Sequence, residues 1–246
     1  YQLDASSGLD TVADTAYPLA AVTANMAYYK LEGGSGTTVT DSSGNGYNGI
    51  ASNLDPYAPG RFGNAAVFNG SSSYIDLGNN SSNNSPLISI SCWLNTTTTA
   101  SESTIFNNGG NDSTSTGLSL VVTSSGILRF NTNNSISGSF GQSFGTTVVN
   151  DGNWHNIVVS YNTTPEMTST SHIFTTTASQ NFIIGRFART TLYYYEGKID
   201  QFRIFPTTLT LANVTSLYNE STVIPSTDGN DSILQFIGGT GTVTFS

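Results

Sequence analysis

Charged side chains are scarce in this chain. Asp, Glu, Lys and Arg make up 9% of its 246 residues, whereas an average soluble domain contains about 25%. Helical bundles and coiled coils are built from Lys, Glu and other strong helix formers, and only seven residues here are Lys or Arg. The composition therefore excludes a coiled coil or an all-helical bundle.

The chain also contains few basic residues and one cysteine. The formal net charge is −9, which repels phosphate backbones, so nucleic acid is not an expected partner. The single cysteine, Cys92, excludes an internal disulfide and a zinc site built from several cysteines. No apolar run approaches the roughly 20 residues that cross a bilayer as a helix, so membrane insertion is not expected.

Small neutral polar residues take the place of the missing charges. Ser, Thr and Asn together account for about 94 residues, and Gly for another 25. Hydrophobic residues still reach 37% and aromatic residues 11%. That share is enough to build a packed core, which argues against a disordered chain.

Short runs of alternating apolar and polar residues, separated by Gly, Asn and Ser, predict many β-strands. The predicted strands are Ala27–Leu31, Ala65–Phe68, Tyr74–Leu77, Leu87–Asn95, Leu118–Thr123, Ile127–Asn131, His155–Tyr161, Phe182–Ile184 and Lys198–Phe205. One segment, Leu209–Asn219, has apolar residues at helical spacing, with Thr210 as a possible N-cap. Many short strands and one short helix predict an antiparallel sandwich or barrel.

Several segments, in order along the chain, resemble the laminin G–like branch of the concanavalin A–like lectin and glucanase superfamily. These segments are Met26–Glu32, Asp41–Gly49, Gly60–Gly70 with Ser73–Ile75, Ile88–Leu94, Asp151–Tyr161 and Gly197–Phe205. The resemblance implies an all-β fold, a two-sheet antiparallel jelly-roll sandwich with one short C-terminal helix. It does not imply one function, because this fold hosts enzymes, lectins and spacers.

The resemblance also suggests how the chain is divided. It covers residues 26–220, which we predict to be the jelly-roll domain. Residues 1–25 contain few strand signals and are predicted to be an N-terminal connector. Residues 221–246 are predicted to be a linker and a strand-forming tail, with apolar runs Ile233–Ile237 and Val243–Phe245. The tail is expected to start another domain or to pair with a neighbouring chain.

The superfamily's glucanases carry a Glu-x-Asp-x-Glu strand, which places three carboxylates on one face. The five glutamates here are dispersed, and none is two residues from an Asp. The chain contains two histidines, too few for most catalytic zinc sites. We therefore expect a protein that is not an enzyme. A carboxylate pair assembled from distant positions is the remaining route to a glycoside hydrolase.

A structural calcium site is the clearest metal chemistry that the resemblance implies. Strand alternation predicts that Asp200 shares a buried face with Phe202 and Ile204, and a buried carboxylate needs a partner. In this superfamily the matching Asp often binds Ca²⁺ with oxygens from early loops, for which Asp41, Asn69 and Gly70 are the candidates. The alternative is that Asp200 accepts hydrogen bonds from backbone N–H groups or pairs with Arg61 or Arg203.

Two aromatic groups are candidates for ligand binding. Alternation in Ile88–Leu94 places Trp93 opposite the apolar face, where it is either a sugar-stacking platform or buried under a loop. In the run Tyr193, Tyr194 and Tyr195, alternation exposes at least one side chain. Tyrosine suits binding surfaces because it supplies a large contact area at low entropic cost. Packing against a neighbouring subunit explains the run equally well.

Sequences of this composition are similar to laminin G–like modules in tail fibres and capsid appendages of marine bacteriophages. One hypothesis is therefore a non-catalytic module on an extracellular virion surface that adheres to cell-surface glycans. The alternative is an architectural module that decorates or spaces a particle through contacts with other virion structural proteins. In both cases we expect a homo-oligomer within a multicopy assembly, which strengthens weak binding through avidity.

Overall fold

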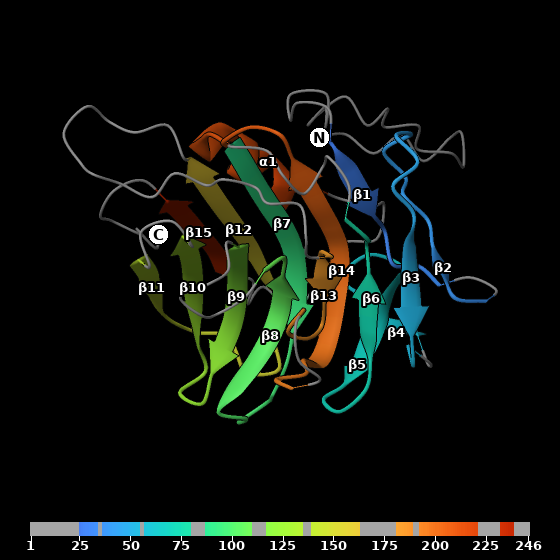
Figure 1. Cartoon of the computed structure of the whole chain (residues 1–246), viewed down its shortest axis with the longest axis horizontal. Coiled ribbons are helices and arrows are strands. Elements are labelled where there is room, and N and C mark those ends of the chain that lie inside the picture. The colour runs from blue at the N-terminus through green and yellow to red at the C-terminus, as the bar shows by residue number, and fades with distance from the viewer. Residues whose placement is uncertain are drawn as a thin grey trace, which may run out of the picture.

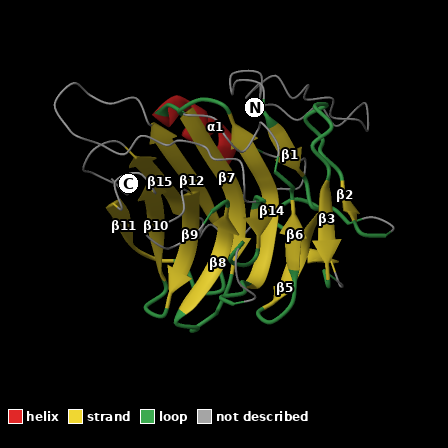
Figure 2. Cartoon of the chain, viewed as in Figure 1, coloured by secondary structure: helices red, strands yellow, loops and turns green. Residues whose placement is uncertain are grey.

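In the computed structural model the chain forms two β-sheets packed face to face, with one short helix against the outer face of one sheet (Figures 1 and 2). The structure describes residues 25–33, 36–54, 57–79, 87–109, 117–134, 139–162, 181–188, 192–220 and 232–238. No helix in these ranges is long and apolar enough to cross a membrane. The predicted all-β sandwich with one short helix is confirmed.

One sheet has eight strands, which pair antiparallel throughout. Their order across the sheet is β11 (Ser139–Val148), β10 (Ile127–Asn134), β9 (Gly117–Thr123), β8 (Glu102–Asn107), β13 (Ile183–Ile184), β6 (Tyr74–Asp76), β3 (Gly49–Ser52) and β2 (Thr38–Val39).

The other sheet has seven strands. Their order is β15 (Ser232–Gly238), β12 (His155–Asn162), β7 (Leu87–Asn95), β14 (Glu196–Phe205), β5 (Asn64–Asn69) and β4 (Tyr57–Pro59), with β1 (Ala27–Tyr29) also paired to β14. All of these pairs are antiparallel except β12 with β15, which is parallel. The strand-forming tail therefore pairs with this chain's own sheet. The division of the chain at residues 25 and 220 stays a prediction, and residues 1–24 and Val243–Phe245 lie outside the described ranges.

The core lies between the two sheets and follows the alternation of the sequence. Along β7, Ile88, Ile90, Cys92 and Leu94 are all buried in one hydrophobic cluster with residues of the eight-stranded sheet such as Leu120. Burying an aliphatic side chain of this size contributes about 1.5–3 kcal/mol. Strand alternation therefore identifies the inward face of β7 correctly.

Helix α1 (Leu211–Tyr218) covers the outer face of the seven-stranded sheet. Thr210 caps its N-terminus: its side chain accepts a hydrogen bond from the Asn213 backbone N–H, and the Asn213 side chain accepts one from the Thr210 N–H. Val214 and Leu217 pack against apolar side chains of β12 and β14. The predicted helix and its cap are confirmed, and this outer face is not open to solvent beneath α1.

A β-bulge in β14 overturns one prediction. Gln201 has a φ of 51°, and the pairing with β7 shifts between Asp200 and Arg203. Because the bulge adds a residue, Asp200 lies opposite Trp93 on the outer face, while Phe202 points into the core. The expectation that Asp200, Phe202 and Ile204 share a face is therefore wrong.

Candidate functional site

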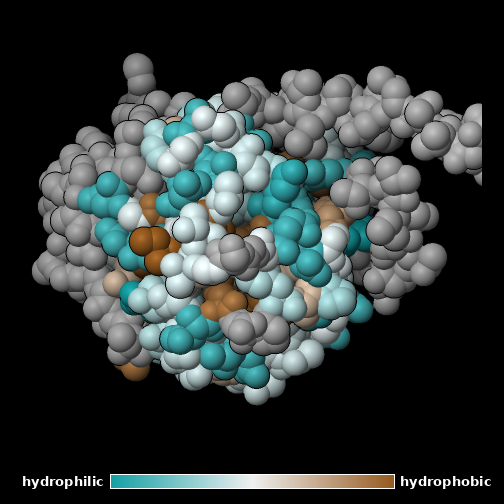
Figure 3. All heavy atoms as spheres, turned by 90° about the vertical axis from the view of Figure 1, so that its right-hand side faces the viewer, coloured by the Kyte–Doolittle hydropathy of each residue, from teal (hydrophilic) through white to brown (hydrophobic). Residues whose placement is uncertain are grey.

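A pocket of about 140 Å³ opens at the end of the sandwich where β2 and β4 are the last strands of their sheets. Its lining combines one aromatic ring, two opposite charges, three hydroxyls and an apolar floor: Tyr57, Lys30, Glu32, Thr38, Thr40, Ser42, Leu31, Val39 and Gly33. Figure 3 views the molecule from this end, where hydrophilic residues surround small hydrophobic patches.

The backbone takes an unusual path at the base of the pocket. Leu31 is 4% exposed and has a φ of 62°, in the left-handed region that bulky residues rarely adopt. Gly33 follows with a φ of 93°, and a Cβ there would lie 3.3 Å from the Tyr57 ring. Backbone strain of this kind collects at functional sites, where it fixes side-chain directions. This path holds Lys30 and Glu32 at the pocket wall.

Glu32 is fixed by the loop between β4 and β5. Its Oε2 accepts a hydrogen bond of 2.7 Å from the Asn64 backbone N–H, and its carbonyl accepts one of 3.2 Å from the Asn64 side chain. Lys30 lies on the same wall, with its Nζ 5.9 Å from the centre of the Tyr28 ring. The lining residues therefore include a carboxylate held by Asn64, an ammonium group beside Tyr28 and three hydroxyl side chains.

This combination suits a small, ring-shaped polar ligand. The volume is close to that of a cavity of about 150 Å³ that accommodates one benzene ring, so the pocket itself holds no more than a single six-membered ring. The Tyr57 ring and the apolar floor match the C–H face of a sugar, while charged and hydroxyl groups match its hydroxyls. Glu32 is the only carboxylate among the lining residues. Most glycosidases use two carboxyl groups that flank the bond, and the lining supplies one.

Trp93 is not available as a stacking platform. It lies on the outer face of β7, as alternation predicts, but it is 0% exposed. The Tyr218 ring of α1 stacks on it with centroids 5.6 Å apart, and the Arg61 guanidinium lies 4.7 Å from its ring. The predicted ligand-binding role of Trp93 is therefore wrong, because α1 and the Arg61–Phe62 loop cover its indole ring.

One ring of the tyrosine run is open to solvent, as expected, although the run does not alternate, because Tyr193 and Tyr195 differ in exposure. Tyr193 is 41% exposed and Tyr194 is half-buried, whereas Tyr195 is 0% exposed and packs edge-on against Phe68. Tyr195 is therefore a core residue. Its predicted ligand-binding role is wrong, because a ligand cannot reach a fully buried side chain. The Tyr193 carbonyl bonds to β8, four strands from β2, so Tyr193 lies far from the pocket. A ligand role for Tyr193 and Tyr194 stays a prediction.

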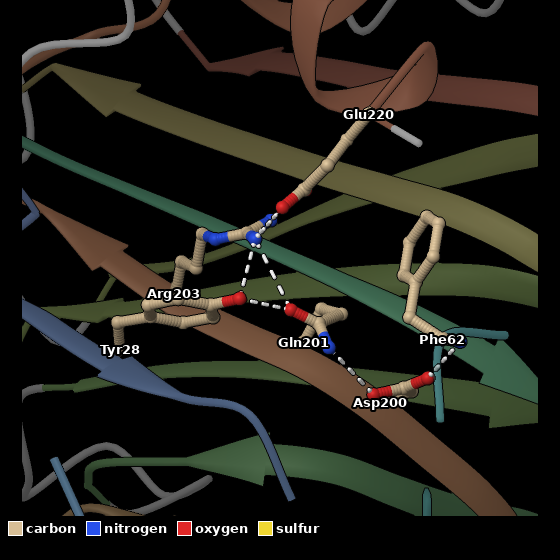
Figure 4. A network of polar contacts seen from close by, with 6 residues as sticks. All are labelled: Tyr28, Phe62, Asp200, Gln201, Arg203 and Glu220. Carbon is tan, nitrogen blue, oxygen red and sulfur yellow. Dashed lines mark hydrogen bonds and ion pairs between the residues drawn. The ribbon is translucent and has the colours of Figure 1, made fainter. Parts of the chain in front are cut away.

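Asp200 belongs to a buried polar network beneath α1 (Figure 4). One carboxylate oxygen accepts a 2.9 Å hydrogen bond from the Phe62 backbone N–H, and the other accepts one of 3.2 Å from the Gln201 side chain. Burial raises the pKa of Asp200 to about 7, and the negative charge of Glu32 adds to the rise against these hydrogen bonds. One alternative predicted from the sequence is that Asp200 accepts hydrogen bonds from backbone N–H groups, and the contact with Phe62 is such a hydrogen bond.

Asp41 is engaged in its own loop. Its two carboxylate oxygens accept hydrogen bonds from the backbone N–H groups of Tyr28, Ser43 and Tyr47 and from the Ser43 hydroxyl, at 2.8–3.0 Å. Burial alone would raise the pKa of Asp41, but these hydrogen bonds hold it below its ordinary value. The carboxylate thus ties the Asp41–Tyr47 turn to β1.

Asn69 and Gly70 do not share a site with Asp200. Asn69 pairs with Glu196 across β5 and β14, and Asp200 lies four residues further along β14, about 13 Å away. The Asn69 side-chain oxygen accepts hydrogen bonds from the N–H groups of Ser71, Ser72 and Ser73. Calcium ligands lie about 2.3–2.6 Å from the ion, so these residues do not fit one Ca²⁺ held with Asp200 and Asp41.

The pocket itself escapes sequence reasoning because it is assembled from three separated segments. A sequence signal that could have indicated it is the pair of opposite charges, Lys30 and Glu32, immediately before Gly33. Tyr57 carries no local signal, because its neighbours form a three-residue strand that ends in Pro59.

Comparisons with known proteins agree with this architecture. A family model described as the concanavalin A-like lectin/glucanases superfamily matches residues 69–215. No curated protein matches the chain significantly.

Solved structures of similar fold include toxin binding domains and a sialidase. The binding domain of Paraclostridial Mosquitocidal Protein 1 is 19% identical, with a TM-score of 0.59 over 78% of this chain and 51% of that one. The binding domain of botulinum neurotoxin DC in complex with SialylT is 14% identical, with a TM-score of 0.55 over 80% and 51%. Trypanosoma rangeli sialidase in complex with sialic acid is 11% identical, with a TM-score of 0.55 over 78% and 32%. The chain thus spans about half of the toxin domains and a third of the sialidase.

Proposed function

The chain belongs to the concanavalin A-like lectin/glucanases superfamily, and we propose that it is a non-catalytic carbohydrate-binding domain whose site is the pocket around Tyr57. The observation that carries the proposal is the lining of that pocket, in which one aromatic ring and an apolar floor accompany two opposite charges and three hydroxyls. The similar toxin binding domain solved with SialylT supports a glycan ligand.

We propose a neutral sugar ring as the ligand. The single carboxylate of Glu32 and the single ammonium group of Lys30 balance within the pocket, while the chain as a whole carries a net charge of −9 that disfavours acidic sugars. A carboxylate and an ammonium group suit the hydroxyls of a sugar, because one accepts and the other donates hydrogen bonds.

We place the domain on a multicopy extracellular surface, such as that of a virion, and this part of the proposal is supported by composition alone. A surface rich in hydroxyl and amide groups and poor in charge suits an exposed module that must avoid unspecific attachment. A millimolar sugar site corresponds to only about 4 kcal/mol. Repetition on a particle would raise its avidity by about 10²–10⁴.

The proposal is tested on a panel of immobilised neutral and sialylated glycans, with wild type compared with variants of the pocket. Replacing Tyr57 by Ala is expected to weaken binding at least about tenfold, which corresponds to about 1.4 kcal/mol, because the stacking surface is lost. Tyr57→Phe keeps the ring and is expected to keep most of the affinity. Lys30→Met changes an exposed side chain, so its expected loss of binding is independent of folding.

The matched control is Tyr193→Asn, which removes an exposed tyrosine far from the pocket. It is expected to bind like wild type. If Tyr193→Asn loses binding while Tyr57→Ala retains it, the site lies on the tyrosine loop and the assignment of the pocket is wrong. If the protein binds only the sialylated glycans of the panel, the proposal of a neutral-sugar ligand is wrong.

A further inference from the structure

The two ends of the sandwich have different sheet edges. At the pocket end the last strands are β2, with two residues, and β4, with three residues that end in Pro59. At the opposite end they are β11, with ten residues, and β15, with seven. Figure 1 shows both strands toward the left-hand side of the molecule, away from β2 and β4. Short strands and proline protect an edge against pairing, whereas long strands invite it.

The strands β11 and β15 themselves carry no charged side chain, and the nearest charge on the neighbouring strand β10 is Arg129, opposite Phe144 and paired with Glu102. The sequences of the two strands, SFGQSFGTTV and SILQFIG, contain no Asp, Glu, Lys or Arg. Proteins usually block an exposed edge with charged side chains, lysine above all, or with proline. Neither device is present in β11 or β15, although the chain carries 23 charged residues elsewhere.

β11 is the more open of the two edges. It pairs with β10 along one side, and no strand among the described residues pairs with its other side. Its side chains Phe144 and Val148 are each 49% exposed. A bulge at 145–147, opposite Leu128, interrupts the pairing with β10, so the regular part of this edge is Ser139–Phe144, about 20 Å long. Its outward N–H and C=O groups pair with no strand among the described residues.

We infer that β11 pairs antiparallel with β11 of a second copy of this chain, so that the two eight-stranded sheets become one continuous sheet. A strand that pairs antiparallel with itself forms a two-fold interface, which is the commonest symmetry of protein dimers. Two molecules that each carry a charge of −9 repel one another, and the uncharged strand β11 is where they can approach at the lowest electrostatic cost. Cross-strand contacts would shield Phe144 and Val148 from water.

The dimer would place the two pockets at its far ends, because each pocket lies at the end of the sandwich opposite β11. Two outward-facing sites on one rigid particle raise the avidity for a multivalent surface. The pairing itself does not depend on what the pocket binds.

Sedimentation equilibrium of the full chain at micromolar concentrations tests this inference. Wild type is expected to be a dimer. The double variant Phe144→Lys with Thr146→Lys adds two positive charges at exposed positions of β11 and is expected to raise the dimer Kd at least about 100-fold, because like charges face each other across the edge. The control Leu211→Lys alters an apolar side chain of α1 that is 63% exposed and is expected to remain a dimer.

Thr146→Lys alone provides a second test in which only an exposed polar side chain changes. Amide hydrogen exchange gives an independent readout, with protection of the β11 amides in wild type expected to increase with protein concentration. A monomeric wild type, a double variant that remains a dimer, or a Leu211→Lys control that dissociates would each overturn the inference.

Discussion

Replacing Asp200 with Asn is expected to raise the free energy of unfolding at pH 8 by about 2 kcal/mol. The carboxyl group is 0% exposed, and burial raises its pKa from 3.8 to about 7. At pH 8 the folded protein therefore holds a desolvated anion close to Glu32. A rise of about three pKa units corresponds to about 4 kcal/mol. Asparagine resembles the protonated carboxyl group in shape and removes this penalty, but its NH2 group cannot accept one of the two hydrogen bonds that the carboxylate accepts. That loss costs about 1–3 kcal/mol, which leaves a net gain of about 2 kcal/mol.

The difference in stability between Asp200→Asn and wild type depends on pH, and this dependence follows from the pKa of Asp200. Below about pH 3.8 the carboxyl group is protonated in both the folded and the unfolded state. Between there and about pH 7 the folded state retains a proton that the unfolded state has lost, so the stability from Asp200 decreases as pH rises. The advantage of Asp200→Asn is therefore expected to vanish as the pH falls toward about 4 and to be complete above about pH 7 in urea denaturation.

Asp41→Asn is the matched control, because hydrogen bonds hold the pKa of Asp41 below its ordinary value despite burial. This variant is expected to lose stability at pH 8. A Ca²⁺ ion bound at Asp200 would reverse the result for Asp200→Asn: wild type would gain stability with millimolar Ca²⁺ and the variant would lose that gain. An Asp200→Asn variant that is less stable than wild type at pH 8 in EDTA contradicts the account of a desolvated carboxylate.

Replacing Arg203 with Met is expected to lower the free energy of unfolding by about 3 kcal/mol. The guanidinium group is buried and donates hydrogen bonds to the Glu220 carboxylate, the Tyr28 hydroxyl and the Gln201 side chain (Figure 4). It also lies 4.2 Å from the centre of the Tyr28 ring. Through these contacts Arg203 joins β14 to β1 and to the segment that follows α1.

A double-mutant cycle with Glu220→Gln separates the ion pair from the rest of the network. The coupling energy is expected to reach about 1 kcal/mol or more, because the two groups are in contact and largely buried. Urea denaturation of wild type, both single variants and the double variant supplies the measurement. A loss below about 1 kcal/mol in Arg203→Met would show that the network does not hold β14, β1 and α1 together.

The sequence predicts the fold well where local patterns are strong. The sequence of β7 alternates strictly between its two faces, so the predicted limits of the strand and its predicted inward face agree with the structure. The helix is predicted with its cap because Thr210 and Asn213 carry their own hydrogen-bonding chemistry. The strands that were not predicted are β2, β3, β4, β8 and β11. Three of these are short, and β8 and β11 contain mostly polar residues or glycine, which give little alternation.

The predicted site residues show which features of the folded protein cannot be predicted from strand alternation. Trp93 is placed on the correct face, but only tertiary packing reveals that α1 covers that face. Asp200 is placed on the wrong face because the bulge at Gln201, which shifts every later residue, has no sequence signal such as glycine. The pocket around Tyr57 depends on chain segments that meet only in the folded domain.

The two ends of the sandwich suggest how the fold separates recognition from assembly. The pocket lies between short, protected edges, while the long uncharged edges lie at the far end. A ligand and a second copy of the chain would therefore approach from opposite directions and not compete. This arrangement makes the binding and association experiments independent of each other.

The most direct test of the central claim is a titration of the ¹⁵N-labelled domain with simple sugars, followed by amide chemical shifts. Galactose, glucose, mannose, N-acetylglucosamine and N-acetylneuraminic acid are suitable probes. The proposal predicts saturable shifts from at least one neutral sugar at Lys30–Gly33, Thr38–Ser42 and Tyr57, the segments that line the pocket. Saturable shifts that occur only around Tyr193 and Tyr194, or no shifts with any of these sugars at concentrations well above the millimolar range, would contradict it.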